Sequence, residues 1–201
     1  MATVIGLILL FLLFIVWGFV TANSLRYKMI TIRAEGWPEK STRILFMSDL
    51  HTSGRGFRIK RTIKLAKEAP CDIVCITGDI IVRRVRQEER VVQALKEIAN
   101  GRPTFLVWGN NDYNPEIDRA KLYEELQKAN INVLVNERVK VGNLTIGGLG
   151  DPFWGKDDIE KTLAEDVDLL LSHTPSPIFE VKKRAKLMLA GHTHAGQFCS
   201  I

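Results

Sequence analysis

Two histidines directly follow a short apolar run in the stretch Lys186-Leu187-Met188-Leu189-Ala190-Gly191-His192-Thr193-His194. An apolar run of this length, bounded by glycine, predicts a short buried strand. Two histidines in the loop that leaves a strand can both point into one crevice. The chain has 4 histidines, and the other two, His51 and His173, also follow apolar runs. Because open α/β sheets gather their sites at the C-terminal ends of strands, the histidines predict one site there.

Length and composition bound the possible functions. With 201 residues, the chain has room for one membrane segment and one domain of roughly 160 to 175 residues. The net charge of +5 is too diffuse to indicate a nucleic-acid partner, and we expect none. The 3 cysteines are an odd number, which argues against a disulfide framework. Cys71 and Cys75 flank an apolar run, and we expect buried thiols there rather than a metal site.

The N-terminal segment is strongly apolar. Residues 4–20 carry no polar side chain, and with their neighbours they reach the roughly 20 residues that cross a bilayer as a helix. The alternative is a cleaved signal peptide, since Val20-Thr21-Ala22 resembles a cleavage site. The absence of a positive n-region and the length of the apolar run favour a retained anchor.

The charges around this segment predict its orientation. The first cations, Arg26, Lys28 and Arg33, follow the apolar run, and the positive-inside rule then keeps the following domain cytoplasmic. We therefore expect a single-pass membrane protein with a transmembrane anchor over residues 1–25, a connector over 26–41 and one domain over 42–201.

Beyond residue 42, apolar runs alternate with helical patterns. This alternation predicts an α/β domain with layered helices and at least one largely parallel sheet. Three adjacent strand candidates between residues 132 and 147 indicate an antiparallel portion or a second sheet. The expected strands are 43–48, 72–77, 104–108, 132–135, 137–141 and 144–147, with two more at Asp168 and Lys186; the expected helices are 57–68, 87–98, 117–129 and 158–164, with one more near Pro175.

Polar side chains with metal-binding chemistry follow several of these strands. They are carboxylates, a carboxamide and imidazoles, without cysteine, a mixture that suits Mn²⁺, Fe or Zn²⁺ better than Ca²⁺ or a structural zinc site. Such a set is too large for one ion and fits two ions that share a bridging carboxylate. Two metals about 3.5 to 4 Å apart can clamp a phosphoryl group and turn a bridging water into hydroxide. The candidates lie in Asp49-x-His51, Gly78-Asp79, Gly109-Asn110-Asn111-Asp112, Leu171-Ser172-His173 and Gly191-His192-Thr193-His194.

This series of motifs, in this order and spacing, resembles the calcineurin-like metallophosphoesterase superfamily over residues 42–197. The resemblance implies a four-layer αββα sandwich with a binuclear metal site at one edge. It implies two divalent ions, Mn²⁺ first, with Fe, Zn²⁺ or Mg²⁺ as alternatives. Asp79, Asn110 and His192 are also the expected catalytic residues. The implied ligands are Asp49, His51 and His194 for one metal, Asn110, His173 and His192 for the other, and Asp79 as the bridge.

The N-terminal helix, the loop Gly148-Leu149-Gly150-Asp151 and residues 191–197 resemble a membrane-associated branch of that superfamily. The branch includes enzymes that act on UDP-2,3-diacylglucosamine and on other phosphodiester or pyrophosphate substrates.

The sequence departs from the family pattern at position 111. Family members usually have histidine after the Gly-Asn pair, as a proton donor to the leaving group, and this chain has Asn111. All 4 histidines are already assigned to metals. A weakened general acid costs most for alkyl monoesters and little where phosphate leaves, because the second pKa of phosphate is about 6. Asn111 therefore favours pyrophosphate or similarly activated linkages.

A second departure concerns the C-terminal end. Family members usually continue after the Gly-His-x-His block with strands that complete the second sheet, whereas this sequence stops at Ile201. We expect either a fragment or a short member with an exposed sheet edge.

The leading functional prediction is a membrane-anchored, metal-dependent phosphoesterase that hydrolyses a phosphodiester or pyrophosphate bond, with nucleotide-linked lipids among its substrate classes. One alternative is a phosphodiesterase or phosphatase for soluble nucleotides. Another is a non-catalytic, metal-binding member of the family.

Overall fold

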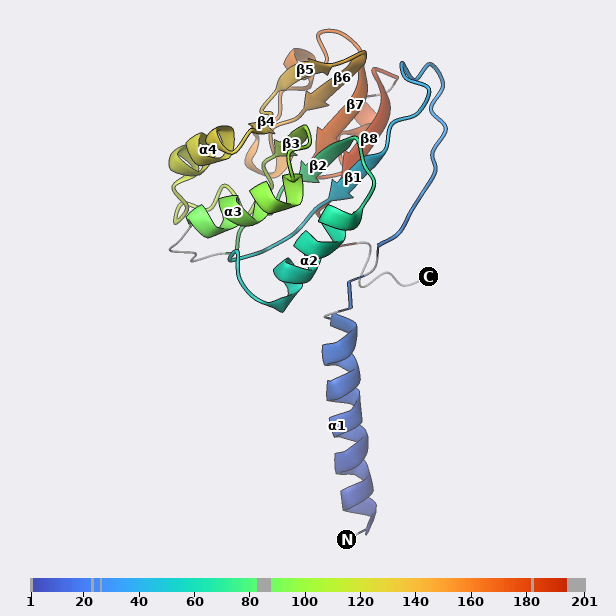
Figure 1. Ribbon diagram of the computed structural model, residues 1–201, viewed down its shortest axis with the longest axis vertical. Coiled ribbons are helices and arrows are strands. Elements are labelled where there is room, and N and C mark those ends of the chain that lie inside the picture. The colour runs from blue at the N-terminus through green and yellow to red at the C-terminus, as the bar shows by residue number, and fades with distance from the viewer. Residues whose placement is uncertain (1, 23, 26, 83–87, 182, 195–201) are drawn as a thin grey trace. The chain divides into compact units, whose positions relative to one another are not determined.

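The computed structural model describes residues 2–22, 24–25, 27–82, 88–181 and 183–194. The chain divides into two compact units, Met1–Thr31 and Ile32–Ile201. The first unit contains the helix α1 (Ala2–Ala22) (Figure 1). Its exposed apolar side chains include Leu10, Phe14 and Trp17. Among the helices in the described ranges, none is long and apolar enough to cross a membrane. The anchor over residues 1–25 therefore stays a prediction.

The second unit begins with a parallel sheet of four strands. They pair in the order β1-β2-β3-β4, and a helix lies between each pair of consecutive strands. The sequences of β2 and β3 are almost continuously apolar because both faces of this sheet are covered, and every residue in these two strands is buried. The elements are β1 (Ile44–Met47), α2 (Phe57–Glu68), β2 (Ile73–Thr77), α3 (Glu88–Ala99), β3 (Thr104–Val107), α4 (Arg119–Lys128) and β4 (Ile131–Val133).

A second sheet of four strands follows in the order β5-β6-β7-β8. Its first two strands form an antiparallel hairpin, and the other pairings are parallel. The hairpin turns at Gly142, whose φ of 60° favours glycine. The elements are β5 (Glu137–Val141), β6 (Leu144–Gly148), the 3₁₀ helix η1 (Pro152–Trp154), α5 (Ile159–Thr162), β7 (Val167–Ser172), α6 (Ile178–Val181) and β8 (Ala185–Ala190).

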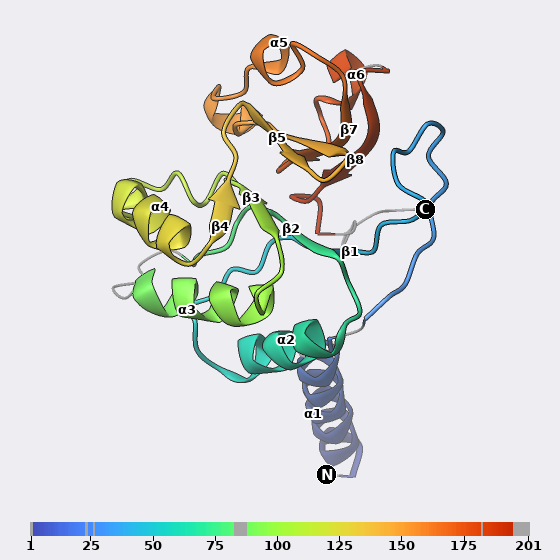
Figure 2. The same cartoon turned by 45° about the horizontal axis from the view of Figure 1, so that its top comes forward.

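The two sheets pack face to face around an apolar core, with helices on the outer face of each (Figure 2). Phe105 and Val107 of the first sheet join Leu169 and Leu171 of the second in this central core. At Gly148 the sheets approach so closely that an added Cβ would overlap the Leu134 side chain. Longer helices α2, α3 and α4 cover the first sheet, and the short α5 and α6 border the outer core of the second.

The expected α/β organisation with a largely parallel sheet is confirmed, as is the antiparallel portion in the middle of the chain. The predicted helices 57–68 and 87–98 form as α2 and α3, although Gln87 lies outside the described residues. The predicted helix 158–164 is shorter, and its C-cap, Leu163, is fully buried. Cys75 is the expected buried thiol, and burial raises its pKa, whereas Cys71 is only half-buried. Residues 195–201, which follow the Gly-His-x-His block, lie outside the described residues.

Arg102 joins the C-terminal ends of two helices that cover the first sheet. Its guanidinium donates to the carbonyls of Ala66 and Ala69 at the end of α2, over 3.0 and 3.1 Å. It also donates to the carbonyls of Ile98 and Ala99 at the end of α3, over 2.6 and 2.9 Å. A cation at a helix C-terminus satisfies carbonyls that have no partner within the helix and interacts favourably with the helix dipole.

We expect Arg102→Ala to lower the free energy of unfolding by about 3 kcal/mol, because it leaves several partly buried carbonyls without a charged donor. Arg102→Lys should recover less than half of that loss, since an ammonium group has fewer donors and no fixed planar fork. Urea unfolding followed by circular dichroism measures both changes. Arg138→Ala is the control, because the Arg138 guanidinium makes one exposed bond of 3.3 Å to the Glu165 carbonyl. Equal effects of the two alanine substitutions would contradict this role.

Candidate metal centre

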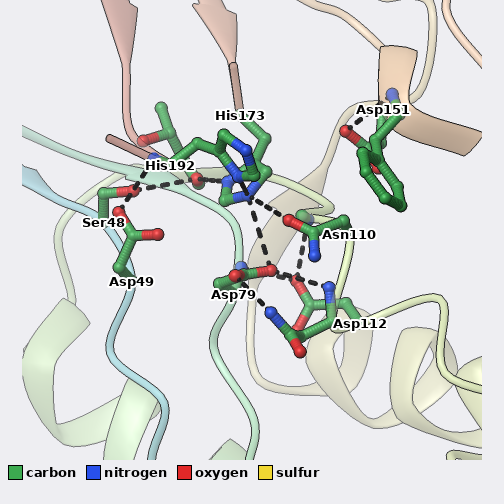
Figure 3. A network of polar contacts seen from close by, with 12 residues as sticks. Ser48, Asp49, Asp79, Asn110, Asp112, Asp151, His173 and His192 are labelled. Carbon is green, nitrogen blue, oxygen red and sulfur yellow. Dashed lines mark hydrogen bonds and ion pairs between the residues drawn. The ribbon is translucent and has the colours of Figure 1, made fainter. Parts of the chain in front are cut away.

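The predicted ligands lie in loops that leave the C-terminal ends of five strands. Asp49 and His51 follow β1, Asp79 follows β2, and Asn110 follows β3. The remaining ligands come from the second sheet, with His173 after β7 and His192 and His194 after β8. Side chains from both sheets point toward one another in Figure 3. The structure therefore brings together residues that are far apart in sequence.

His173 presents its Nε2 to the centre of this group. Its Nδ1 lies 2.7 Å from the Thr77 carbonyl, which can only accept, so Nδ1 carries a proton, and this contact favours the tautomer with the lone pair on Nε2. Around that Nε2 lie Asn110 Oδ1 at 2.9 Å, His192 Nδ1 at 3.1 Å and Asp79 Oδ1 at 3.5 Å. Lone pairs that converge in this way are the donor set that a cation needs, and the Thr77 carbonyl fixes the ring in the ligating tautomer.

Asp49 supplies a second indication of a cation. Its Oδ2 accepts the backbone N–H of His192 over 3.0 Å, but its Oδ1 is buried and has no hydrogen-bond partner among the residues that the structure describes. A buried carboxylate oxygen without a partner is costly unless a cation compensates for it. Ligand atoms of Asp49, His51 and His194 lie within 4.8 Å of one another, as do those of Asp49, Asp79 and His173. The donor set therefore fits metal ions.

Asp79 lies between the two proposed groups of ligands. Its Oδ2 is 3.5 Å from His51 Nε2, and its Oδ1 is 3.5 Å from His173 Nε2. His51 belongs to the group implied for one ion and His173 to the group implied for the other. The side chain is buried, and each oxygen faces a different histidine, which is the placement that a bridging carboxylate requires.

Five of the proposed ligands have backbone conformations that L-amino acids rarely adopt. Their φ angles are positive, in the left-handed region that favours glycine. Such residues cost roughly 1 to 3 kcal/mol each and persist only where the surroundings impose them. The bonds from Asp49 N to Gly78 O, over 3.1 Å, and from His51 N to Asp79 O, over 2.8 Å, hold part of this backbone. The angles are 53° at Asp49, 38° at His51, 53° at Asp79, 68° at His192 and 48° at His194.

Asp112 ties the loop after β2 to the loop after β3. Its fully buried carboxylate accepts the backbone N–H groups of Asp79 and Gly109, both over 2.8 Å, and of Ile80 over 3.0 Å. Burial raises the pKa of Asp112 to about 7, although the backbone donors act in the opposite direction. The sequence placed Asp112 in the third motif but gave no indication of this role, because Asp79 and Ile80 lie 33 and 32 residues earlier.

Two glycines of the motifs are required by close packing. An added Cβ at Gly109 would overlap the Asp79 carboxylate, and one at Gly191 would overlap the Ser48 hydroxyl. The lack of a side chain at these two positions therefore lets the loops approach closely.

An aromatic pair lies beside the Asn110 loop. Trp154 donates its indole N–H to the Asn110 carbonyl over 3.0 Å, and Phe153 next to it is 68% exposed. Both residues belong to η1, whose N-cap is Asp151. The Asp151 carboxyl is buried, and burial raises its pKa. Within the described part of the chain, one of its oxygens has no hydrogen-bond partner. The sequence left Asp151 unplaced and did not indicate the aromatic pair.

Comparison with known proteins agrees with this arrangement. Residues 42–196 match the family model described as calcineurin-like phosphoesterase. The chain belongs to the calcineurin-like phosphoesterase family. It is thus a metal-dependent phosphoester hydrolase, in a family that typically binds two divalent metal ions, and the residues described above supply candidate ligands for them.

Several relatives share most of the length of this chain. The chain is 29% identical to the metallophosphoesterase YkoQ of Bacillus subtilis, over 87% of this chain and 70% of that protein. It is 30% identical to a metallophosphoesterase of Aquifex aeolicus, over 86% of this chain and 70% of that protein. A zebrafish (Danio rerio) protein named transmembrane protein with metallophosphoesterase domain is 28% identical, over 84% of this chain and 44% of its own length.

A solved structure, described as that of a novel archaeal phosphodiesterase, has the same fold. The TM-score is 0.50 with 18% sequence identity, over 78% of this chain and 87% of the other. This likeness concerns the fold alone.

We expect Asp79→Asn to lower metal occupancy at both positions and to abolish hydrolysis, because the neutral amide removes a charge that both ions share. His194→Ala should mainly empty one position, since its Nε2 lies beside Asp49 Oδ1 at 3.5 Å. Elemental analysis of protein loaded with Mn²⁺ and desalted measures both. Two full equivalents of metal in Asp79→Asn would rule out the bridging role.

Proposed function

We propose that this chain hydrolyses a phosphodiester or pyrophosphate bond at a binuclear metal site, with Mn²⁺ as the metal. The observation that carries the proposal is the position of the Asp79 carboxylate, 3.5 Å from His51 on one side and from His173 on the other. The proposed ligands are Asp49, His51 and His194 for one ion and Asn110, His173 and His192 for the other, with Asp79 shared.

The metal ions and the side chains of the site would have different roles in hydrolysis. When bound, two divalent ions supply a hydroxide nucleophile and neutralise the charge that develops on the phosphoryl oxygens. Asp79, Asn110 and His192 are the proposed catalytic residues, because their polar atoms meet within 3.5 Å of His173 Nε2. Their task is to hold the reacting centre in one geometry, which Asp112 and the motif glycines support through the backbone.

The identity of residue 111, which is asparagine in place of the usual proton-donating histidine, supports a substrate with a good leaving group. The Asn111 side chain donates to Asp79 over 2.6 Å, and the 4 histidines are all among the proposed ligands. A leaving group must then carry its negative charge without assistance, which phosphate or an aryl oxide does far better than an alkoxide.

A nucleotide-linked lipid is the proposed substrate class. The exposed aromatic pair beside Asn110 supports this assignment, because aromatic side chains offer apolar contact area and stacking surface. Phe153 and Trp154 are 68% and 46% exposed, and their ring centroids are 6.1 Å apart. The pair would contact the base or acyl portion of the substrate while its phosphate groups bind at the metals.

We expect a nucleotide-linked lipid with a pyrophosphate bond, or an aryl phosphodiester, to be cleaved at least about 10²-fold faster than an alkyl monoester, which is the lower range of general acid catalysis. The detergent-solubilised, Mn²⁺-loaded chain is tested with the three substrates, and with a soluble nucleotide that carries the same pyrophosphate bond. A hydrolysis rate that does not depend on the pKa of the leaving group would contradict the proposed preference for good leaving groups. Faster turnover of the soluble nucleotide would favour the soluble-nucleotide alternative, and no turnover would favour a non-catalytic member.

We propose further that the N-terminal segment, residues 1–25, anchors the chain in a membrane as a single span, with the catalytic domain on the cytoplasmic side. Support comes from the exposed apolar side chains of α1 and from the cations that follow it. The zebrafish and cattle (Bos taurus) relatives are named transmembrane proteins with a metallophosphoesterase domain.

We expect the chain to stay in the membrane fraction after an alkaline carbonate wash and to resist protease added outside intact cells. An exported marker protein, digested in the same sample, is the control for protease activity. Permeabilised cells should lose the domain. Recovery of a soluble exported form that starts near Asn23 would establish a cleaved signal peptide instead.

A further inference from the structure

Asn111 binds both oxygens of the Asp79 carboxylate. Its backbone N–H donates to Asp79 Oδ1 over 2.8 Å, and its side-chain amide donates to Asp79 Oδ2 over 2.6 Å. A carboxylate can only accept, so the nitrogen of the Asn111 carboxamide is the end that faces Asp79. The short distances are typical of hydrogen bonds to a charged acceptor.

The loop that carries Asn111 is held in place on either side of it. The neighbouring residue, Asp112, accepts N–H groups from Asp79 and Gly109 over 2.8 Å. The Asp112 N–H donates to the Gly109 carbonyl over 3.0 Å, and the Asn114 N–H donates to the Asn111 carbonyl over 3.1 Å. The two loops are thus joined by both residues 111 and 112, through the side chain of Asp79 in one case and its backbone in the other.

We propose that Asn111 is a positioning residue for the metal centre, which acts by fixing the rotation of the Asp79 carboxylate. With Asn111 bonded to both oxygens, Oδ1 faces His173 and Oδ2 faces His51, each at 3.5 Å. This inference rests on the proposed function, because it takes Asp79 as the ligand shared by two ions. It gives position 111 a role of its own, in place of the lost proton donor that the sequence indicated.

Two other interpretations of Asn111, as a general acid and as a loop residue without a role, do not fit its contacts. A carboxamide does not release a proton near neutral pH, and the Asn111 carboxamide already donates one of its N–H groups to Asp79 over 2.6 Å, so Asn111 is not a general acid. A loop residue without a role would face solvent, whereas Asn111 is only half-exposed and faces a buried carboxylate. Loss of an outer hydrogen-bond partner of a ligand typically weakens metal affinity by about 10 to 100-fold.

The test measures Mn²⁺ binding by calorimetry on the metal-free full chain in detergent, without reference to turnover. Asn111→Ala removes the side-chain donor but keeps the backbone N–H. Asn114→Ala is the matched control, because it makes the same change in the same loop, where the Asn114 carboxamide contacts the Glu116 N–H over 3.0 Å. We expect about 10 to 100-fold weaker binding of both Mn²⁺ equivalents in Asn111→Ala, and less than about a threefold change in the control.

Circular dichroism of the metal-free variants shows whether they are folded. Asn111→Ser is measured in parallel, because its short hydroxyl keeps the position polar but lacks the reach of the amide. Electron paramagnetic resonance of the Mn²⁺-loaded wild type should contain the signal of two coupled ions, and this signal should be lost or altered in a folded variant at position 111.

Wild-type affinity for both equivalents in a folded Asn111 variant would overturn the inference, as would weakening confined to one equivalent. Failure of the proposed function is distinct from these results. A wild type that binds two Mn²⁺ ions but hydrolyses no phosphoester would remove the proposed function, while the comparison of affinities would still decide the role of Asn111. A wild type that binds no Mn²⁺ would overturn both.

Discussion

The structure depends on one buried carboxylate that is constrained from every side. The backbone N–H of Asp79 is bonded to Asp112, and both of its oxygens are bonded to Asn111. Its φ of 53° is one that an aspartate adopts only under constraint. A charge buried in this way is tolerated when hydrogen bonds and cations surround it. The rest of the fold can be understood as the scaffold that delivers these partners.

That scaffold explains why two sheets are needed. The first sheet supplies Asp49, His51, Asp79 and Asn110 at its strand ends, and the second supplies three histidines. Neither sheet alone carries a complete ligand group, since each proposed ion takes residues from both. The apolar core between the sheets, with Phe105 against residues such as Leu169, therefore sets the distance between the two halves of the metal centre. A change of packing in that core would displace the proposed ligands, because close-packed protein interiors transmit strain.

Much of the fold and the ligand candidates could be predicted from the sequence. Buried parallel strands are read as apolar runs, and each run of this kind ends at a chemically distinctive residue, as β3 does before Gly109 and Asn110. The contacts that orient those residues could not be predicted. Asp112, Arg102 and Trp154 contact partners that are 33, 36 and 44 residues away, and single-sequence patterns report only local spacing. Asn111 is the clearest case, since its identity indicated a missing proton donor while its contacts indicate a partner of Asp79.

The positive φ angles at five of the proposed ligands affect how the protein would change under selection. At each such position glycine relieves the steric cost that an aspartate or histidine bears. Replacing a proposed ligand with glycine can therefore raise the stability of the metal-free fold while it removes a group that would bind metal. Stability and activity thus favour different residues at the same positions. A lineage selected only for abundance or heat resistance would drift toward a stable protein without a metal centre. The proposed ligands Asp49, His51, Asp79, His192 and His194 would be kept in their demanding conformations only where the reaction itself matters to the organism.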